Sequence, residues 1–438
     1  MTTLVSFIFV LGVLIFVHEL GHFLMARRIG VRVLTFSLGF GPKILAFRRG
    51  DTEYCISVIP LGGYVKMAGE TVEDDRTGAS DEFLSKTKWQ RFQVLVMGPV
   101  MNLALAVVLL AIVISQGAYA PAFDLDPVVV DAVVDRSPAA VAGLTRGDRI
   151  LAVDGAAVAT WEQLADAIAR QKTAQIEILV ERNRLTEQKR VVRSADAERP
   201  NDIGVRPKMR PQILSVTPGD PAAHAGLEAM DVIVAADGEA SPSYDRVRAI
   251  IAAHEDRPFA IEVERSGSRV ALNVTPRRIG DAPRVGASIS PFEVRTFYPG
   301  AIGAFTMSVQ RNWEGSVAIL QTLGRVVTGQ TSVRQLAGPV GIAGQTGAAA
   351  AQGWTALLSL MALISLNLGL LNLMPVPVLD GGHIAILALE GVSRRDFSIA
   401  VKEKMLLVGF ALLVLLMATV IYNDLTRIAW IQKALPWK

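Results

Sequence analysis

The sequence predicts a polytopic α-helical membrane protein in which two small α+β domains are inserted between the membrane-spanning segments. Apolar runs long enough to cross about 30 Å of hydrocarbon lie near both ends of the chain. The region between them is more polar and contains an internal repeat. The 438 residues are 51% hydrophobic and 19% charged, which is too apolar for an ordinary soluble protein and too charged for membrane helices alone.

Four segments are predicted to span the membrane: residues 4–25, 94–114, 354–373 and 405–422. The first has neither a charged flank before it nor a small-residue cleavage site, so we expect a retained helix and not a signal peptide. Lysine and arginine cluster after the first span, before the second, and between the third and fourth. These loops are therefore predicted to be cytoplasmic, with both termini and the long 115–350 region on the opposite side.

Charge and cysteine content exclude other classes of protein. The formal net charge of +3 indicates basic loops beside a lipid bilayer and predicts no nucleic-acid partner. Cys55 is the only cysteine, so a disulfide within the chain and a cysteine-rich zinc site are both excluded.

The N-terminal membrane region, residues 1–115, is predicted to contain strands in addition to its two helices. Between its spans, residues 32–69 predict short strands, because apolar stretches alternate there with glycines. A membrane-associated β-hairpin, whose edge could pair with an extended peptide, is one interpretation. A cytoplasmic β-meander is the other, and the sequence leaves both open.

The motif His18-Glu19-Leu20-Gly21-His22 lies inside the first apolar run. Histidines four residues apart share one face of a helix, where both can bind a single Zn²⁺, and Glu19 is placed to polarise a water molecule. The alternative is a polar helix face whose histidines bond to backbone carbonyls. Because ionisable groups at bilayer depth are costly, the metal interpretation is favoured.

A catalytic zinc site usually has three protein ligands, so a further ligand is expected from another span. The end of the third span supplies Asn372, Pro375, Pro377 and then Asp380-Gly-Gly. The prolines break the helix and free backbone groups around the carboxylate. Asp380 is the favoured third ligand, and His383 is the alternative.

The external region contains one motif twice. A shift of 83 residues superposes Pro138-Ala139-Ala140 on Pro221-Ala222-Ala223, and an Asp-Gly turn follows in each copy. The motif resembles that of bacterial, circularly permuted PDZ domains, which implies tandem PDZ domains at residues 124–200 and 201–280. Ile203 and Gly204 are predicted to form the peptide-binding loop of the second copy, and no glycine-containing equivalent is evident in the first. Alternatively, both copies are steric gates.

Residues 281–353 are expected to form a linker with amphipathic segments before the C-terminal membrane region, 354–438. Within the linker, Gly338-Pro339-Val340-Gly341 fits either a re-entrant helix or a simple connection.

The three sets of motifs together resemble the site-2 protease family of intramembrane zinc metalloproteases. They are the His-Glu-x-x-His sequence, Met97-Gly98-Pro99-Val-Met-Asn102, and Asn372-x-x-Pro-x-Pro-x-x-Asp380-Gly. The resemblance implies that His18, His22 and Asp380 bind zinc and that Glu19 is the general base. It also implies that Asn372 and Pro375 engage the substrate strand, and that Asn102 has a structural or site-lining role.

The same resemblance implies a cellular location and a class of substrate. The protein is expected in the bacterial inner membrane, with PDZ domains and both termini periplasmic and the active site near the cytoplasmic side. Its substrates would be single-span membrane proteins already trimmed by an upstream site-1 protease, such as an anti-sigma factor or signal-peptide remnants. The PDZ domains would act as a periplasmic substrate filter.

The same residues argue against two other classes of protein. A catalytically silent PDZ scaffold is disfavoured, because all four catalytic positions are intact. A metal transporter is disfavoured because the sequence offers one compact ligand set, with a glutamate in the position of a base.

Overall fold

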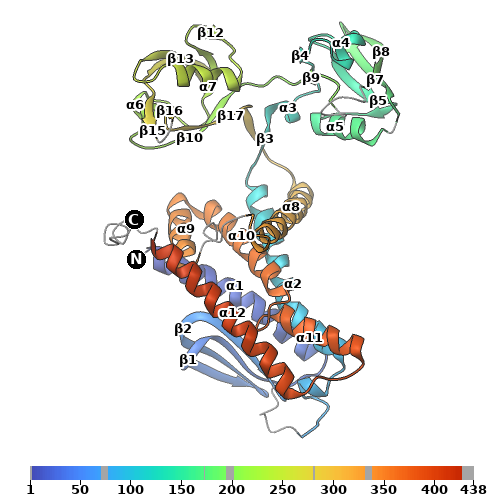
Figure 1. The fold of residues 1–438 in the computed structure, drawn as a ribbon, viewed down its shortest axis with the longest axis vertical. Coiled ribbons are helices and arrows are strands. Elements are labelled where there is room, and N and C mark those ends of the chain that lie inside the picture. The colour runs from blue at the N-terminus through green and yellow to red at the C-terminus, as the bar shows by residue number, and fades with distance from the viewer. Residues whose placement is uncertain are drawn as a thin grey trace. The chain divides into compact units, whose positions relative to one another are not determined.

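The computed structural model describes residues 2–70, 77–171, 173–193, 202–279, 282–330 and 338–426 (Figure 1). The chain forms two compact units. One comprises Met1–Gly117 and Tyr298–Lys438, and the other comprises Ala118–Phe297. We refer to them as the membrane unit and the inserted unit.

The membrane unit consists of helices and one β-hairpin. Its helices are α1 (Thr2–Arg28), α2 (Lys88–Ser115), α8 (Ala301–Val327), α9 (Pro339–Gln352), α10 (Trp354–Leu373), α11 (Asp380–Ser393) and α12 (Ile399–Thr426). Among the described residues, α1, α2 and α10 are long and apolar enough to cross a membrane. The fourth predicted span lies within α12, several of whose side chains fall outside the described residues, so a total of four spans stays a prediction.

Small residues allow the central helices to approach closely. A Cβ on Gly21 of α1 would lie 2.4 Å from the carbonyl oxygen of Met97 in α2, and a Cβ on Gly369 of α10 would lie 2.9 Å from Leu103. Helix association within a membrane depends on such close backbone contact, because lipid supplies no hydrophobic drive between helices. The motif of the first span therefore lies directly against Met97 in the motif of the second.

The hairpin pairs β1 (Val33–Arg49) with β2 (Thr52–Met67) in antiparallel register. Near α1 it is buried through Val33, Phe36 and Val65. Towards its tip the apolar side chains are exposed, for example Leu45 at 65% and Phe47 at 64%. An apolar face of this kind favours the membrane-associated hairpin over the cytoplasmic meander, because the same face exposed to water would be prone to aggregation.

The segment that begins at Gly338 is helical. The backbone N–H groups of Gly338 and Gly341 donate to the buried carboxylate of Asp424, at 3.2 and 2.9 Å. A carboxylate at a helix N-terminus satisfies free N–H groups and complements the helix dipole. Helix α9 follows, so the simple-connection alternative is wrong for residues 339–352.

The inserted unit contains the two copies of the repeat. The first copy comprises β4 (Ala132–Val133), α4 (Pro138–Val141), β5 (Arg149–Val153), β6 (Ala156–Ala157), α5 (Trp161–Arg170), β7 (Gln175–Arg182), β8 (Leu185–Val192) and β9 (Val205–Arg206). The second comprises β10 (Gln212–Val216), α6 (Pro221–His224), β11 (Val232–Ala236), β12 (Glu239–Ala240), α7 (Tyr244–Ala253), β13 (Phe259–Arg265), β14 (Ser268–Val274), β15 (Arg277–Ile279), β16 (Ala282–Arg284) and β17 (Ala287–Ser290). Each copy has its own buried core.

An ion pair explains why an aspartate recurs at one position of the repeat. In the first copy, Arg182 donates to both carboxylate oxygens of buried Asp148, at 2.6 and 2.7 Å, and to the carbonyl of Gly143. In the second copy, Arg265 makes the same contacts to Asp231, both at 2.7 Å. The buried carboxylate is thus paired by a bidentate arginine, the geometry in which a buried charge is tolerated.

The structure corrects the assignment of the Ile203–Gly204 loop. Ile203 is buried in the core of the first copy, and β9, which follows Gly204, pairs with β4 of that copy. The second copy has its own equivalent at Gly286, followed by β17, which pairs with β10. The permutation therefore places this strand at the end of each copy. The predicted domain ends at 200 and 280 are correspondingly too early.

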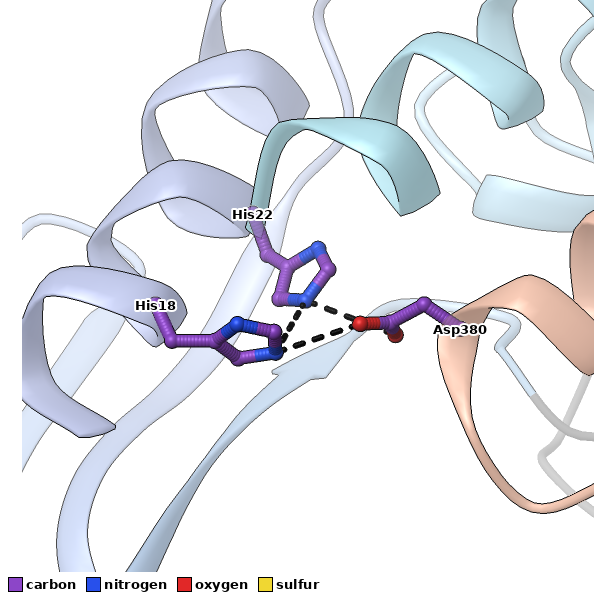
Figure 2. Close-up of side chains that lie close together, drawn as sticks. All are labelled: His18, His22 and Asp380. Atoms are coloured by element: carbon purple, nitrogen blue, oxygen red, sulfur yellow. Dashed lines mark hydrogen bonds and ion pairs between the residues drawn. The ribbon is translucent and has the colours of Figure 1, made fainter. Parts of the chain in front are cut away.

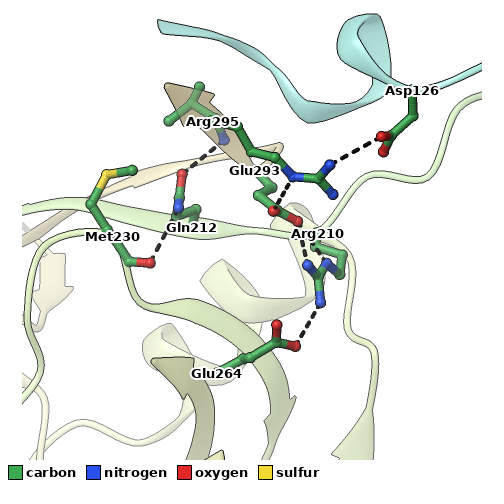
Figure 3. A network of polar contacts seen from close by, with 8 residues as sticks. Asp126, Arg210, Gln212, Met230, Glu264, Glu293 and Arg295 are labelled. Carbon is green, nitrogen blue, oxygen red and sulfur yellow. Dashed lines mark hydrogen bonds and ion pairs between the residues drawn. The ribbon is translucent and has the colours of Figure 1, made fainter. Parts of the chain in front are cut away.

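The two ends of the inserted unit lie side by side. Strand β3 (Ala118–Pro121) pairs with β18 (Val294–Phe297), and α3 (Ala122–Leu125) follows β3. Figure 3 shows how charged groups tie these strands to the second copy. Arg210 binds both Glu264 and Glu293, while Arg295 binds Glu293 and Asp126.

Candidate active site

Two histidines of α1 face one another at the centre of the membrane unit. Spaced by one helical turn, His18 and His22 place their ring centroids 4.8 Å apart, and their Nε2 atoms are separated by 3.2 Å. Each residue is only 8% exposed. Buried imidazoles that converge through the same ring nitrogen are arranged to share a third group.

Asp380 supplies that group from the first residue of α11 (Figure 2). Its carboxylate oxygens lie 3.2 Å from Nε2 of His18 and 3.5 Å from Nε2 of His22. The donor atoms of the three residues all lie within 4.8 Å of one another. His383, the alternative third ligand, does not belong to this group.

The loop between α10 and α11 brings Asp380 into place. A Cβ on Gly381 or Gly382 would lie within 2.3 Å of a carbonyl oxygen of the same loop, so both positions require glycine. Val378 has φ +84°, a left-handed conformation that is strained for a β-branched residue. The backbone here is held in a costly shape beside the site, as is common where geometry serves function.

The other nitrogen of each ring, Nδ1, contacts helix α2. Nδ1 of His22 lies 2.8 Å from the carbonyl oxygen of Val94, and Nδ1 of His18 lies 3.2 Å from the side-chain amide of Asn102. Both partners belong to α2. Outer contacts of this type orient the imidazoles of metal sites and select the nitrogen that is free to bind.

Glu19 and Asn372 line the same cavity, of about 330 Å³, together with Tyr64 and Val65 of β2. The carboxylate of Glu19 faces the backbone N–H of Val65. Asn372 approaches Nε2 of His18 at 3.5 Å. The site is therefore built from α1, β2 and the α10–α11 connection.

The donor set fits zinc. Two imidazole nitrogens and one carboxylate oxygen form the three-ligand arrangement that leaves a fourth position for water or substrate. Among the described residues, the group contains neither the thiolates of softer metal sites nor the many oxygens that calcium or magnesium requires. The outer contacts of both imidazoles are also in place.

Of the residues predicted from sequence, the structure brings together His18, Glu19, His22, Asn372 and Asp380. Pro375 lies in the α10–α11 loop but not on the cavity wall, and Ile203 and Gly204 belong to the first repeat copy. The hairpin interpretation of residues 32–69 included a strand edge that could pair with a peptide, but it singled out no residue of that strand. Tyr64 and Val65 of β2 are the lining residues that the sequence did not point to.

The model of Peptidase family M50 matches residues 6–416, so the chain belongs to that family. The chain is therefore a zinc metalloprotease. It is 34% identical to the regulator of sigma-E protease RseP of Escherichia coli over 97% of this chain and 98% of that protein. The Yersinia pestis protease RseP is also 34% identical, over 97% of this chain and 99% of its own length.

A relative from Neisseria meningitidis whose name describes a zinc metalloprotease is 33% identical over 98% of this chain and all of its own. Among solved structures, the PDZ domain of an SdrC-like protein from Listeria monocytogenes aligns with 19% of the chain, at 28% identity and a TM-score of 0.17. The alignment covers 87% of that domain.

Proposed function

We propose that this protein cleaves single-span membrane proteins within the bilayer, using zinc bound by His18, His22 and Asp380. The observation that carries the proposal is that Asp380 of α11 meets His18 and His22 on α1, a helix that is long and apolar enough to cross a membrane. Ionisable groups at that depth are expensive unless they serve a function.

Zinc in this donor set supplies Lewis acidity, which makes water nucleophilic near neutral pH and polarises a scissile carbonyl. Glu19 is the general base in this proposal. It lies in the same cavity as the donors, on the wall formed with Val65. Its carboxylate takes the proton of the attacking water and returns it to the leaving amine, a transfer that typically contributes about 10²–10⁴-fold.

A helical substrate must unwind before it can be cut, since its amides are bonded within the helix. Strand β2 lines the cavity through Gly63, Tyr64 and Val65 and can receive an extended peptide by strand addition. Asn372, 3.5 Å from His18, is placed to bind the freed backbone groups. Pro375 acts by ending α10 in this proposal.

The repeat copies are proposed to be tandem PDZ domains that filter substrates on the periplasmic side. The shared element order and the glycine before β9 and before β17 support this assignment. Both termini are placed in the periplasm, with four spans in the inner membrane and the active site near the cytoplasmic side. The expected substrate is an anti-sigma factor already cut by a site-1 protease, in line with the names of the RseP relatives.

Cleavage of a single-span reporter by the detergent-purified full chain tests the proposal, with wild type beside Glu19→Gln and zinc measured on both. We expect zinc on both proteins and cleavage by wild type alone. Cleavage by the variant would remove Glu19 from its assigned role. Zinc without cleavage of any trimmed reporter would favour a silent PDZ scaffold.

A further inference from the structure

Asn102 is the most deeply buried polar side chain in contact with the proposed metal ligands. It is 0% exposed, and its backbone carbonyl accepts a hydrogen bond from Ser365 of α10 at 2.7 Å. Its amide nitrogen lies 3.2 Å from Nδ1 of His18. Its amide oxygen is buried and has no hydrogen-bond partner among the described residues. A buried amide with one end unsatisfied calls for a physical explanation.

The partner of His22 provides the comparison. A neutral imidazole carries one N–H and one lone pair, and a backbone carbonyl can only accept. The carbonyl of Val94, 2.8 Å from Nδ1 of His22, therefore places the hydrogen on Nδ1. The lone pair of Nε2 in the neutral ring is then directed at the site.

The partner of His18 imposes no such restriction, because the two ends of an amide differ. With the amide nitrogen facing it, Nδ1 of His18 accepts, so the hydrogen is on Nε2. There it is directed at the carboxylate of Asp380, 3.2 Å away. A metal ion needs the lone pair of Nε2, so the hydrogen must then be on Nδ1. Nδ1–H needs an acceptor, and the unsatisfied amide oxygen is that acceptor.

We propose that Asn102 is a positioning residue whose side-chain amide turns by half a rotation when His18 takes up metal. The turn exchanges the amide nitrogen and oxygen in nearly the same space. It allows His18 to move its hydrogen from Nε2 to Nδ1 and remain neutral. The inference rests on the proposed ligand role of His18, and it makes metal uptake dependent on an acceptor at position 102.

Two nearly isosteric variants separate the acceptor from the packing. Asn102→Asp presents an oxygen to His18 without any turn of the side chain, and Asn102→Leu keeps the volume but removes every polar atom. Asn312→Leu is the control, because Asn312 is also a buried amide of the membrane unit but bonds within α8, to Ser308. Zinc affinity is measured on the full chain in detergent by competition with a chelator, alongside the thermal unfolding midpoint.

We expect Asn102→Leu to lose about 10–100-fold in zinc affinity, the usual cost of removing an outer-shell partner of a ligand. Asn102→Asp should bind zinc much as wild type does, and Asn312→Leu should change stability without changing zinc affinity. Equal zinc affinity in Asn102→Leu and wild type would overturn the inference, as would an equal loss in Asn102→Asp. Wild type that binds no zinc would instead overturn the proposed function.

A measurement on wild type alone covers the case in which a variant does not fold. Nitrogen-15 NMR of labelled histidine distinguishes Nδ1–H from Nε2–H, and the chain has only five histidines. Zinc titration should convert His18 from Nε2–H to Nδ1–H while the Nδ1 hydrogen of His22 stays in place. A His18 that already carries its hydrogen on Nδ1 before zinc is added would refute the amide turn.

Discussion

Replacing Gly98 by alanine should disable the metal site through one methyl group. Gly98 lies on α2 directly against the imidazoles of α1. A Cβ there would lie 2.3 Å from Nε2 of His22 and 2.9 Å from Cε1 of His18. Ordinary van der Waals contact begins at 3.4 Å, so the His22 ring must retreat by about 1 Å. The ring cannot swing freely, because Nδ1 is bonded to Val94 on the same helix as Gly98.

A displacement of about 1 Å in a catalytic group can cost about 10²-fold in rate, and a displaced metal ligand also weakens metal binding. We therefore expect Gly98→Ala to lose about 10²-fold or more in reporter cleavage and to bind zinc more weakly than wild type. The assay is turnover of the single-span reporter by the full chain in detergent, with zinc measured by chelator competition.

Gly12→Ala is the matched control. It adds the same methyl group to α1, where no atom of the described residues lies within 4 Å of the new Cβ. It should preserve cleavage and zinc. If Gly98→Ala retains wild-type turnover and zinc affinity, the imidazoles are not confined by α2, and the geometry described for the site is wrong.

Three further outcomes are expected. Asp380→Asn should lower zinc affinity by at least the ~10–100-fold that loss of an outer-shell partner costs, and unchanged zinc stoichiometry would point to a different third ligand. Burial raises the pKa of Asp148, but hydrogen bonds from Arg182 and from the Thr145 N–H lower it more, so its pKa lies below the ordinary 3.8. The stability that this carboxylate gives the first copy is present above pH 3.8 and is lost as pH falls through the lower folded-state pKa. Hydrogen exchange of the first copy within the full chain should show this loss, and Asp148→Asn should flatten it; an identical acid profile in the variant would contradict the assignment. Replacing residues 118–297 by a short flexible linker should retain cleavage of a trimmed reporter and add cleavage of an untrimmed one. A short linker is sufficient because Ala118 pairs with Phe297, so the two junctions lie close together. Loss of both activities in gel-based cleavage assays would show that the inserted unit does more than filter.

The metal donors were predictable because their geometry is mostly local. On any helix, the four-residue spacing of His18 and His22 places them on one face. The two glycines after Asp380 indicate a close approach between backbone segments. The contact of Asn102 with His18 was not predictable, since it depends on how α1 and α2 are rotated against each other.

Strand pairing was harder to predict than the repeat itself. The sequence shows two copies, but it does not show to which copy the strand between them, β9, belongs. Residues 205–206 lie six positions before β10 and more than seventy after β4, yet they pair with β4. Tertiary hydrogen bonding and burial of Ile203 decide this, and neither has a local signature.

The late position of β9 and β17 has a consequence for how the chain is made. Neither copy can close until its final strand has left the ribosome, so each remains open along β4 or β10 through most of its synthesis. Strand β17 follows β9 by about 80 residues, which takes about 4–16 s at ~5–20 residues per second. Vectorial synthesis thus gives β9 time to close the first copy before β17 exists. Refolding from denaturant removes that order, because β9 and β17 then compete for two equivalent slots, and strand exchange becomes the characteristic misfolding route.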